Sequence, residues 1–178
     1  MKYYIVSDIH GSSKNIKKVL EYFDVDGDYL FVLGDILYHG PRNNVPEYYE
    51  PKEVMAMLNE RKDKIFAVRG NCDGEVDQMV LDFPITADYL MFPFEGYKLF
   101  MTHGHLYNDF SWMNENDVVL SGHTHIPVAH QENGKVFLNP GSISIPKMNH
   151  VPSFATLENH VFTLYDLDKN VLMTYKLK

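Results

Sequence analysis

Residues 2–11 read Lys2-Tyr3-Tyr4-Ile5-Val6-Ser7-Asp8-Ile9-His10-Gly11, an apolar run that ends in a short polar motif. The run has the length of one buried strand, and the polar residues follow where that strand ends. Residues i and i+2 of an extended backbone point the same way, so Asp8 and His10 are expected to face one place. This stretch predicts a binding site built on a strand end.

The same succession of apolar run and polar motif recurs along the chain. The later motifs are Gly34-Asp35, Gly70-Asn71-Cys72-Asp73, His103-Gly104-His105 and Gly122-His123-Thr124-His125. Open sheets with parallel strands bind ligands at the carboxyl ends of their strands. We therefore expect these motifs to contribute to one site.

Strands and helices alternate in the first part of the chain. Apolar runs predict strands over 2–7, 29–33 and 65–68, and helical spacing predicts helices over about 13–23 and 51–61. Ser12 and Ser13 offer a cap for the first helix. Asp73 is either a neighbour of the metal or the N-cap of a further helix over 75–81, and the cap is the favoured interpretation. The Pro-containing segment 35–51 is expected to be an ordered loop.

Strands dominate the second half. They are expected over 89–94, 98–102, 117–120, 128–131, 135–138, 153–157, 161–166 and 171–177. Turns are expected at Glu95-Gly96 and at Glu132-Asn133-Gly134, where two runs lie close enough for hairpins. The pattern fits two packed sheets with helices outside.

Length and composition bound the organisation of the chain. With 178 residues and 45% hydrophobic content, one core and a single domain over 1–178 are expected. Cys72 is the one cysteine, so no internal disulfide can form and a cytoplasmic location is expected. We expect no signal peptide and no membrane span, because the apolar runs are too short.

The charge balance narrows the partners. Lys and Arg number 16 and Asp and Glu 24, a formal charge of −8. Duplex nucleic acid binding needs a basic surface that releases counterions, so it is not expected. Nucleotides remain possible substrates.

The polar motifs supply a set of possible metal ligands: two carboxylates, one amide and four imidazoles. They are Asp8, His10, Asp35, Asn71, His103, His123 and His125. This mixture suits a borderline divalent metal, manganese first, with zinc, iron, nickel or magnesium possible, and is too rich in nitrogen for calcium. Seven ligands exceed one open site, so two divalent metal ions with a bridging carboxylate are expected.

In this order the five motifs resemble those of the calcineurin-like metallophosphoesterases. The stretches 39–43, 69–79 and Asn139-Pro140-Gly141-Ser142 more narrowly resemble the bacterial YfcE-like phosphodiesterases, and the likeness runs from Met1 to about Leu177. The resemblance implies an α+β fold of four αββα layers, in which two mixed β-sheets pack face to face with helices on the outer sides.

The resemblance also implies roles for single residues. It places Asp8, His10, Asp35 and His125 around a first metal, and Asp35, Asn71, His103 and His123 around a second, with Asp35 bridging. Asn71, Cys72 and His103 form the implied catalytic set. The implied reaction is hydrolysis of a small phosphodiester, possibly a nucleotide, by a hydroxide that bridges the two metals.

Three other residues are candidates for contact with the substrate. Arg42 is a candidate for holding a phosphate oxygen, because a guanidinium matches phosphate geometry. His39 and His105 flank ligand motifs and are further candidates. Cys72 stands where the superfamily commonly has histidine, and a thiol is a poor acid for an alkoxide leaving group. We therefore expect diesters with acidic leaving groups to be the better substrates.

Three alternatives remain beside the phosphodiesterase. The first is a metal-binding protein-interaction scaffold of the same fold, as in the retromer subunit. The second is a phosphomonoesterase, and the third is a protein with one structural metal. Aromatic residues in the loops also suggest a homodimer or homotetramer.

Overall fold

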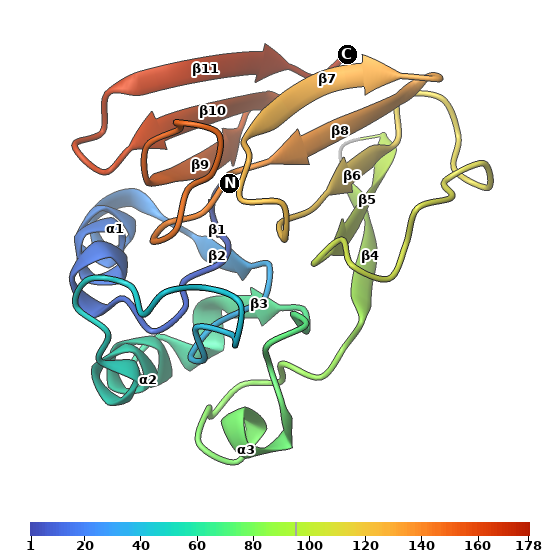
Figure 1. The fold of residues 1–178 in the computed structure, drawn as a ribbon. Helices are drawn as coiled ribbons and strands as arrows, with labels where there is room; N and C mark the ends of the chain where they lie inside the picture. The colour runs from blue at the N-terminus through green and yellow to red at the C-terminus, as the bar shows by residue number, and fades with distance from the viewer. Residues whose placement is uncertain (95) are drawn as a thin grey trace.

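The computed structural model describes residues 1–94 and 96–178 and contains two mixed β-sheets. The larger sheet has the strand order β11-β10-β9-β1-β2-β3 (Figure 1). In it β1, β2 and β3 run parallel, while β9, β10 and β11 form antiparallel pairs. Its strands are β1 (Lys2–Val6), β2 (Tyr29–Val32), β3 (Ile65–Ala67), β9 (Ser153–Glu158), β10 (Val161–Asp166) and β11 (Val171–Lys176).

The smaller sheet has the order β4-β5-β6-β8-β7. Its inner strands β5, β6 and β8 are parallel, and the edge strands β4 and β7 pair antiparallel with β5 and β8. Its strands are β4 (Tyr89–Phe94), β5 (Tyr97–Thr102), β6 (Val118–Leu120), β7 (Val128–Glu132) and β8 (Lys135–Asn139). The two hairpins are therefore confirmed, although Glu95 of the first expected turn lies outside the described residues.

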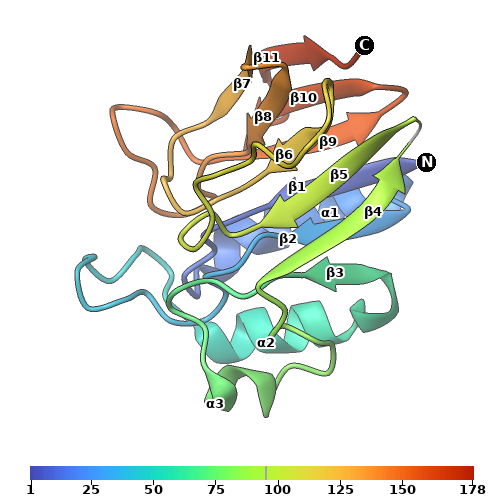
Figure 2. The same cartoon turned by 90° about the vertical axis from the view of Figure 1, so that its right-hand side faces the viewer.

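The two sheets pack face to face (Figure 2). Alternate side chains of their strands form the core between them. In β5, Leu99 and Met101 point into the core between the sheets, and Phe100 points to the opposite face. Ile5 of β1 enters the same core from the larger sheet, while its neighbours Tyr4 and Val6 face the helices. This alternation is the period of two that a strand imposes, and it lets both faces of each sheet be buried.

Helices cover the outer face of the larger sheet. They are α1 (Ser13–Asp26) and α2 (Pro51–Asn59). A 3-10 turn, η1 (Lys62–Lys64), and the short α3 (Glu75–Gln78) follow along the chain, and neither of them buries a residue. The predicted stripe of Ile16, Val19, Leu20 and Phe23 is buried on α1. Ser12 precedes α1, but its hydroxyl donates to the carbonyl of Glu47 and makes no capping bond, so that prediction was wrong in its chemistry.

A loop covers the outer face of the smaller sheet. Phe100 and Val119 on that face pack against Met113 of the segment between β5 and β6, with Phe110 and Tyr107 of the same segment beside them. The expected pair of mixed sheets with helices outside is confirmed. On the smaller sheet, within the described residues, aromatic loop side chains take the place that a helix would occupy.

Among the described residues, none belongs to a helix with both the length and the apolar character needed to cross a lipid bilayer.

Candidate metal centre

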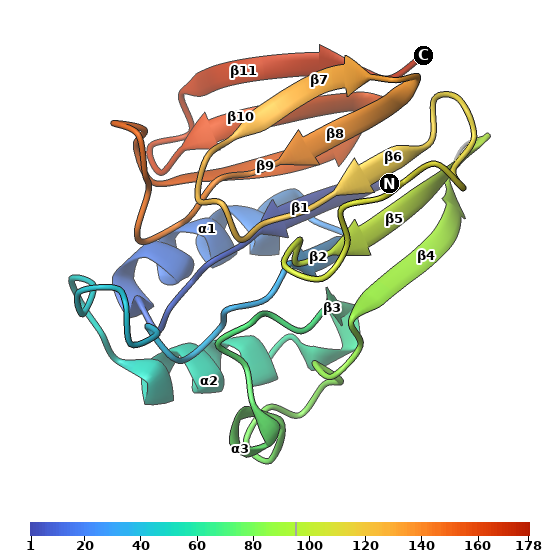
Figure 3. The ribbon, with the colours of Figure 1, turned by 45° about the vertical axis from the view of Figure 1, so that its right-hand side comes forward.

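The site residues lie after the ends of strands from both sheets. Asp8 and His10 follow β1, and Asp35 follows β2 in the larger sheet. His103 follows β5, and His125 follows β6 in the smaller sheet. Figure 3 shows β1, β5 and β6 ending on the same side of the molecule. The site is therefore built where the two sheets meet.

The backbone at the site is not extended. Asp8, His10 and Asp35 have φ angles of 53°, 47° and 54°, and His123 and His125 have 66° and 60°. We expected residues i and i+2, such as Asp8 and His10, to face one place because the backbone would be extended. That reason was wrong, since the backbone at these residues is left-handed. Left-handed residues turn the chain at the strand exit, and such strained backbone is concentrated at functional sites.

Backbone hydrogen bonds hold these turns together. The N–H groups of Asp8, His10 and Gly11 donate to the carbonyls that follow β2, those of Gly34, Asp35 and Ile36, at 2.9–3.1 Å. The two strand exits are thus fixed in register, which brings the side chains of Asp8, His10 and Asp35 together.

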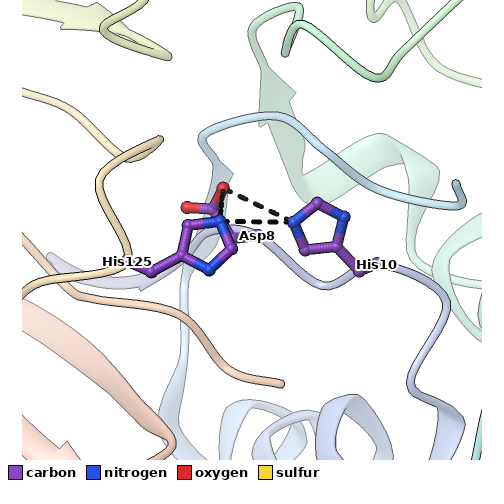
Figure 4. Close-up of side chains that lie close together, drawn as sticks. All are labelled: Asp8, His10 and His125. Atoms are coloured by element: carbon purple, nitrogen blue, oxygen red, sulfur yellow. Dashed lines mark hydrogen bonds and ion pairs between the residues drawn. The ribbon is translucent and has the colours of Figure 1, made fainter. Parts of the chain in front are cut away.

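Asp8, His10 and His125 form the first group of side chains (Figure 4). Asp8 Oδ1 lies 3.2 Å from His125 Nε2 and 3.8 Å from His10 Nε2, and the two Nε2 atoms are 3.4 Å apart. All three residues are at most 3% exposed. Three donor atoms at such separations can bind one cation.

Asp35 joins this group to a second one. Its Oδ2 lies 3.7 Å from His10 Nε2, and its Oδ1 lies 3.6 Å from His103 Nε2. The amide oxygen of Asn71 is 3.1 Å from the same His103 nitrogen. The carboxylate of Asp35 therefore faces both groups, which is the position expected of a bridging ligand.

Backbone carbonyls orient three of the imidazoles. The Nδ1–H groups of His10, His103 and His125 donate to the carbonyls of Tyr38, Leu33 and Ile145 at 2.8, 2.6 and 2.5 Å. With the proton on Nδ1, each Nε2 presents its lone pair to the cluster. Such partners fix the tautomer of metal-binding histidines.

The buried carboxylate of Asp8 has too few partners without a cation. Its Oδ2 accepts hydrogen bonds from the Ser7 hydroxyl at 2.7 Å and from the His123 N–H at 3.0 Å, but within the described part of the chain the buried Oδ1 has no hydrogen-bond partner. Burial alone would raise the pKa of Asp8, yet the nearby imidazoles of His125 and His103 and the hydrogen bond from Ser7 hold it below its ordinary value. An ionised, unpaired oxygen beside imidazole lone pairs fits a divalent cation.

Asp73 supports the site from behind. Its Oδ2 accepts the N–H groups of Asp35 and Gly70, and its Oδ1 accepts that of Ile36, at 2.7–2.8 Å. The prediction that Asp73 caps a helix over 75–81 was wrong, because α3 spans only Glu75–Gln78 and Gly74 stands at its N-cap. The carboxylate instead satisfies the donors of two strand exits.

The remaining predicted ligand and the cysteine lie at the edge of the cluster. His123 is half-buried, with its ring 5.1 Å from that of His103, and it belongs to none of the three-residue groups. Cys72 forms a group with His10 and Asp35, and its N–H donates to Asp35 Oδ1 at 2.8 Å. Burial and the nearby Asp35 carboxylate raise the pKa of the Cys72 thiol to about 12.

A cavity of about 440 Å³ opens beside the cluster. Residues of the cluster and its edge, Asp35, Asn71, Cys72, His123 and His125, line it together with Arg42, Asn43, Thr124 and Lys147. Arg42 therefore lies where a substrate group could reach it. The volume suits a small ligand.

The other two substrate candidates lie outside this lining. His39 packs edge-on against Tyr38 and Tyr49, with ring centroids 4.8 and 5.1 Å away. His105 packs behind His103 and His123, at 5.3 and 6.0 Å. Their assignment to the substrate stays a prediction.

Sequence reasoning missed two contributors. Ser7 directly precedes Asp8 at a strand end, and that adjacency was a usable signal. Lys147 follows Pro146 in a polar loop, and nothing local in the sequence places it near His125.

The profile of the calcineurin-like phosphoesterase superfamily domain matches residues 1–160. The chain belongs to this superfamily. It is 49% identical over 172 residues to phosphodiesterase YfcE of Escherichia coli K12, covering 94% of this chain and 93% of that protein.

Solved structures agree with this membership. A structure of YfcE, described as a phosphoesterase from E. coli, has a TM-score of 0.96 and 46% identity and covers all of both chains. The zinc complex of Vps29 from Entamoeba histolytica has a TM-score of 0.64 at 18% identity over the full length of both chains, so that likeness concerns the fold alone. The family membership and the Asp and His cluster both indicate divalent metal ions.

Proposed function

We propose that this superfamily member is a binuclear, metal-dependent phosphodiesterase that acts on a small phosphodiester. The observation that carries the proposal is the convergence of five buried Asp and His side chains beside a cavity that two of them, Asp35 and His125, line. Within the described residues, Asp8 Oδ1 has no hydrogen-bond partner among them. The 49% identity to a phosphodiesterase supports the choice of a diester over a monoester.

The proposed metal ligands divide into two sets. Asp8, His10, Asp35 and His125 would hold one cation, and Asp35, Asn71, His103 and His123 the other, with Asp35 shared. Bound there, two divalent cations would supply charge neutralisation at the phosphoryl oxygens and a nucleophilic water near neutral pH. Manganese is the proposed ion, because the ligand set mixes nitrogen and oxygen donors.

The chain's own residues position the reaction. The Nδ1–H bonds of three histidines fix the donor atoms before substrate arrives, so little reorganisation is needed. Arg42, which lines the cavity, binds a phosphate oxygen. Hydrolysis then forms a P–O bond to the oxygen of water and breaks the P–O bond to the leaving alcohol, whose oxygen receives a proton.

The test is hydrolysis of bis(p-nitrophenyl) phosphate and p-nitrophenyl phosphate by metal-stripped protein, with manganese, zinc, magnesium or no metal added back. We expect manganese to restore turnover of the diester far more than of the monoester. A stronger response of the monoester would favour a phosphomonoesterase. Silence with every metal would contradict the proposal and favour the scaffold.

The metal count needs a separate measurement. Elemental analysis of the reloaded protein should give two metal ions per chain, and the Asp35→Asn variant should bind fewer, since Asp35 faces both groups. A single ion in the active wild-type protein would contradict the binuclear site.

A homodimer or homotetramer is also proposed. Tyr89 and Trp112 are about half exposed beside Phe100 on the smaller sheet. Exposed aromatic groups of this kind mark association surfaces. Light scattering at several protein concentrations measures the state, and a monomer throughout would contradict this part.

A further inference from the structure

The lining of the cavity carries two cationic side chains on different loops. Arg42 comes from the loop after β2, and Lys147 from the loop between β8 and β9. Asp35 and His125 of the metal cluster line the same cavity. A ligand in this cavity can therefore contact the cluster and two separate cationic side chains.

The loop that carries Arg42 rests on Cys72. A Cβ at Gly40 would lie 2.9 Å from Cys72 Sγ, so the backbone approaches the sulfur closely. The Asn43 side-chain amide donates to the His39 carbonyl at 2.8 Å and closes the loop. Arg42 is therefore held on the side of the cavity that Cys72 lines.

The loop that carries Lys147 is tied to His125. The Nδ1–H of His125 donates to the Ile145 carbonyl, and the Lys147 N–H donates back to the His125 carbonyl at 3.3 Å. The chain then turns tightly, since the His150 N–H donates to the Lys147 carbonyl at 3.1 Å and the two residues between have positive φ. The backbone of Lys147 is thus fixed beside a proposed metal ligand.

Arg42 and Lys147 have no carboxylate partner among the residues that the structure describes. Some other basic side chains of this acidic protein do have one, as Lys2 pairs with Asp26, Arg61 with Asp24 and Arg69 with Asp88. Two unpaired cations at one cavity are available to an anionic ligand.

The charge at the cavity exceeds what a simple diester supplies. This step rests on the proposed function, in which two divalent cations outweigh the charges of Asp8 and Asp35 and Arg42 adds to the excess. The scissile group of a phosphodiester brings one negative charge. A further cation at Lys147 is matched by a substrate with a second anionic group.

We propose that Lys147 determines specificity by binding a second phosphate group, carried by the substrate apart from the scissile diester. The substrate class is then a small phosphodiester with an additional phosphate, such as a nucleoside diester phosphorylated at another hydroxyl. Lys147 selects this class by lowering KM and takes no part in bond breaking.

Two substrates that differ by one phosphate test the proposal: thymidine 5′-(p-nitrophenyl phosphate) and the same compound with a 3′-phosphate. With the manganese-loaded protein we expect kcat/KM to be about 10-fold higher for the 3′-phosphorylated compound, as one charge-assisted hydrogen bond provides. Lys147→Met should bring this ratio near one through KM, and Lys147→Arg should retain it.

Lys52→Met is the matched control, because Lys52 is an exposed lysine on α2 that does not line the cavity. The ratio of the two kcat/KM values in Lys52→Met should equal the ratio in the wild type. Equal kcat/KM values for the two compounds in the wild type, or a ratio that Lys147→Met leaves unchanged, would overturn the inference alone. If Lys147→Met lowered kcat/KM equally for both compounds, Lys147 would act at the scissile group, and the inference would be overturned as well. No hydrolysis of any diester would reject the proposed function itself, and this inference with it.

Discussion

Ser7 shows how a residue that binds no metal can set the properties of a ligand. Its fully buried hydroxyl donates to Asp8 Oδ2 at 2.7 Å and leaves Oδ1 free for the cluster. Ser7→Ala removes this bond, and such supporting partners are worth about 10–100-fold in metal affinity or activity. We expect the manganese concentration for half-maximal activity to rise by about that factor, as measured by titrating the metal-stripped variant.

Ser12→Ala is the matched control for Ser7. Ser12 is also fully buried, but its hydroxyl donates to the Glu47 carbonyl and does not touch the cluster. Its manganese titration should follow the wild type. Parallel shifts in both variants would mean that buried serines stabilise the fold without tuning Asp8.

Asp73 makes a second prediction at this scale. Its carboxylate accepts three backbone N–H groups, and Asp73→Asn keeps the size but turns an NH₂ group toward those donors. One unsatisfied buried donor costs about 1–3 kcal/mol, so we expect a loss of this size in the free energy of unfolding of the metal-free protein. Urea denaturation measures it.

Asp77→Asn tests whether the position of Asp73 matters. Asp77 accepts one N–H, that of Gly74, at an exposed helix start. The Asp77→Asn variant should lose less free energy of unfolding than Asp73→Asn, and its manganese affinity should equal that of the wild type. If Asp73→Asn lost no more stability than Asp77→Asn, the supporting role of Asp73 would be refuted.

At the scale of elements, Asp117 joins the starts of two parallel strands. The carboxylate precedes β6 and accepts the N–H groups of Lys98 in β5 and of Asn114, while the Lys98 ammonium lies 3.3 Å away. Burial acts to raise the pKa of Asp117, but these donors hold it below its ordinary value. The stabilisation is therefore present above the unfolded-state pKa of about 3.9 and is lost as pH falls through the folded-state value.

The pH dependence of unfolding tests this assignment. In metal-free protein, Asp117→Asn should lower the free energy of unfolding at pH 6 by about 1–3 kcal/mol. The gap between variant and wild type should narrow toward pH 3, because the wild-type carboxyl then becomes protonated. A gap of constant size across this range, in urea titrations at each pH, would show that the charge of Asp117 is not what joins β5 to β6.

The sequence predicted the helices and strands better than it predicted the contacts of single residues. The apolar runs located the described strands, and the stripe on α1 faces the core as its spacing indicates. Local patterns failed where a side chain had a distant partner. Asp73 has the sequence position of a helix cap, but its carboxylate accepts the N–H groups of Asp35 and Ile36, which are distant in sequence. Asp8 and His10 have left-handed φ angles where their N–H groups bond to the carbonyls that follow β2.

At the scale of the whole molecule, the cluster joins the two sheets. Asp8, His10 and Asp35 belong to the larger sheet, and His103 and His125 to the smaller one. The choice of ligands followed from motif order and resemblance. The loop over Phe100 and the placement of Lys147 did not, because both depend on how segments distant in sequence pack.

Metal binding should therefore stabilise the packing of one sheet on the other. At a free metal concentration of 100 times Kd, binding adds about 2.7 kcal/mol per site, which raises Tm by roughly 5–10 °C for a chain of this size. Calorimetry of metal-stripped protein with and without manganese measures the shift. Asp8→Asn is the informative variant, since it removes the unpaired oxygen. It should show a much smaller shift with manganese, and its metal-free Tm should equal or exceed that of the wild type, because a buried charge without a partner is gone. An undiminished shift in Asp8→Asn would mean that manganese binds elsewhere.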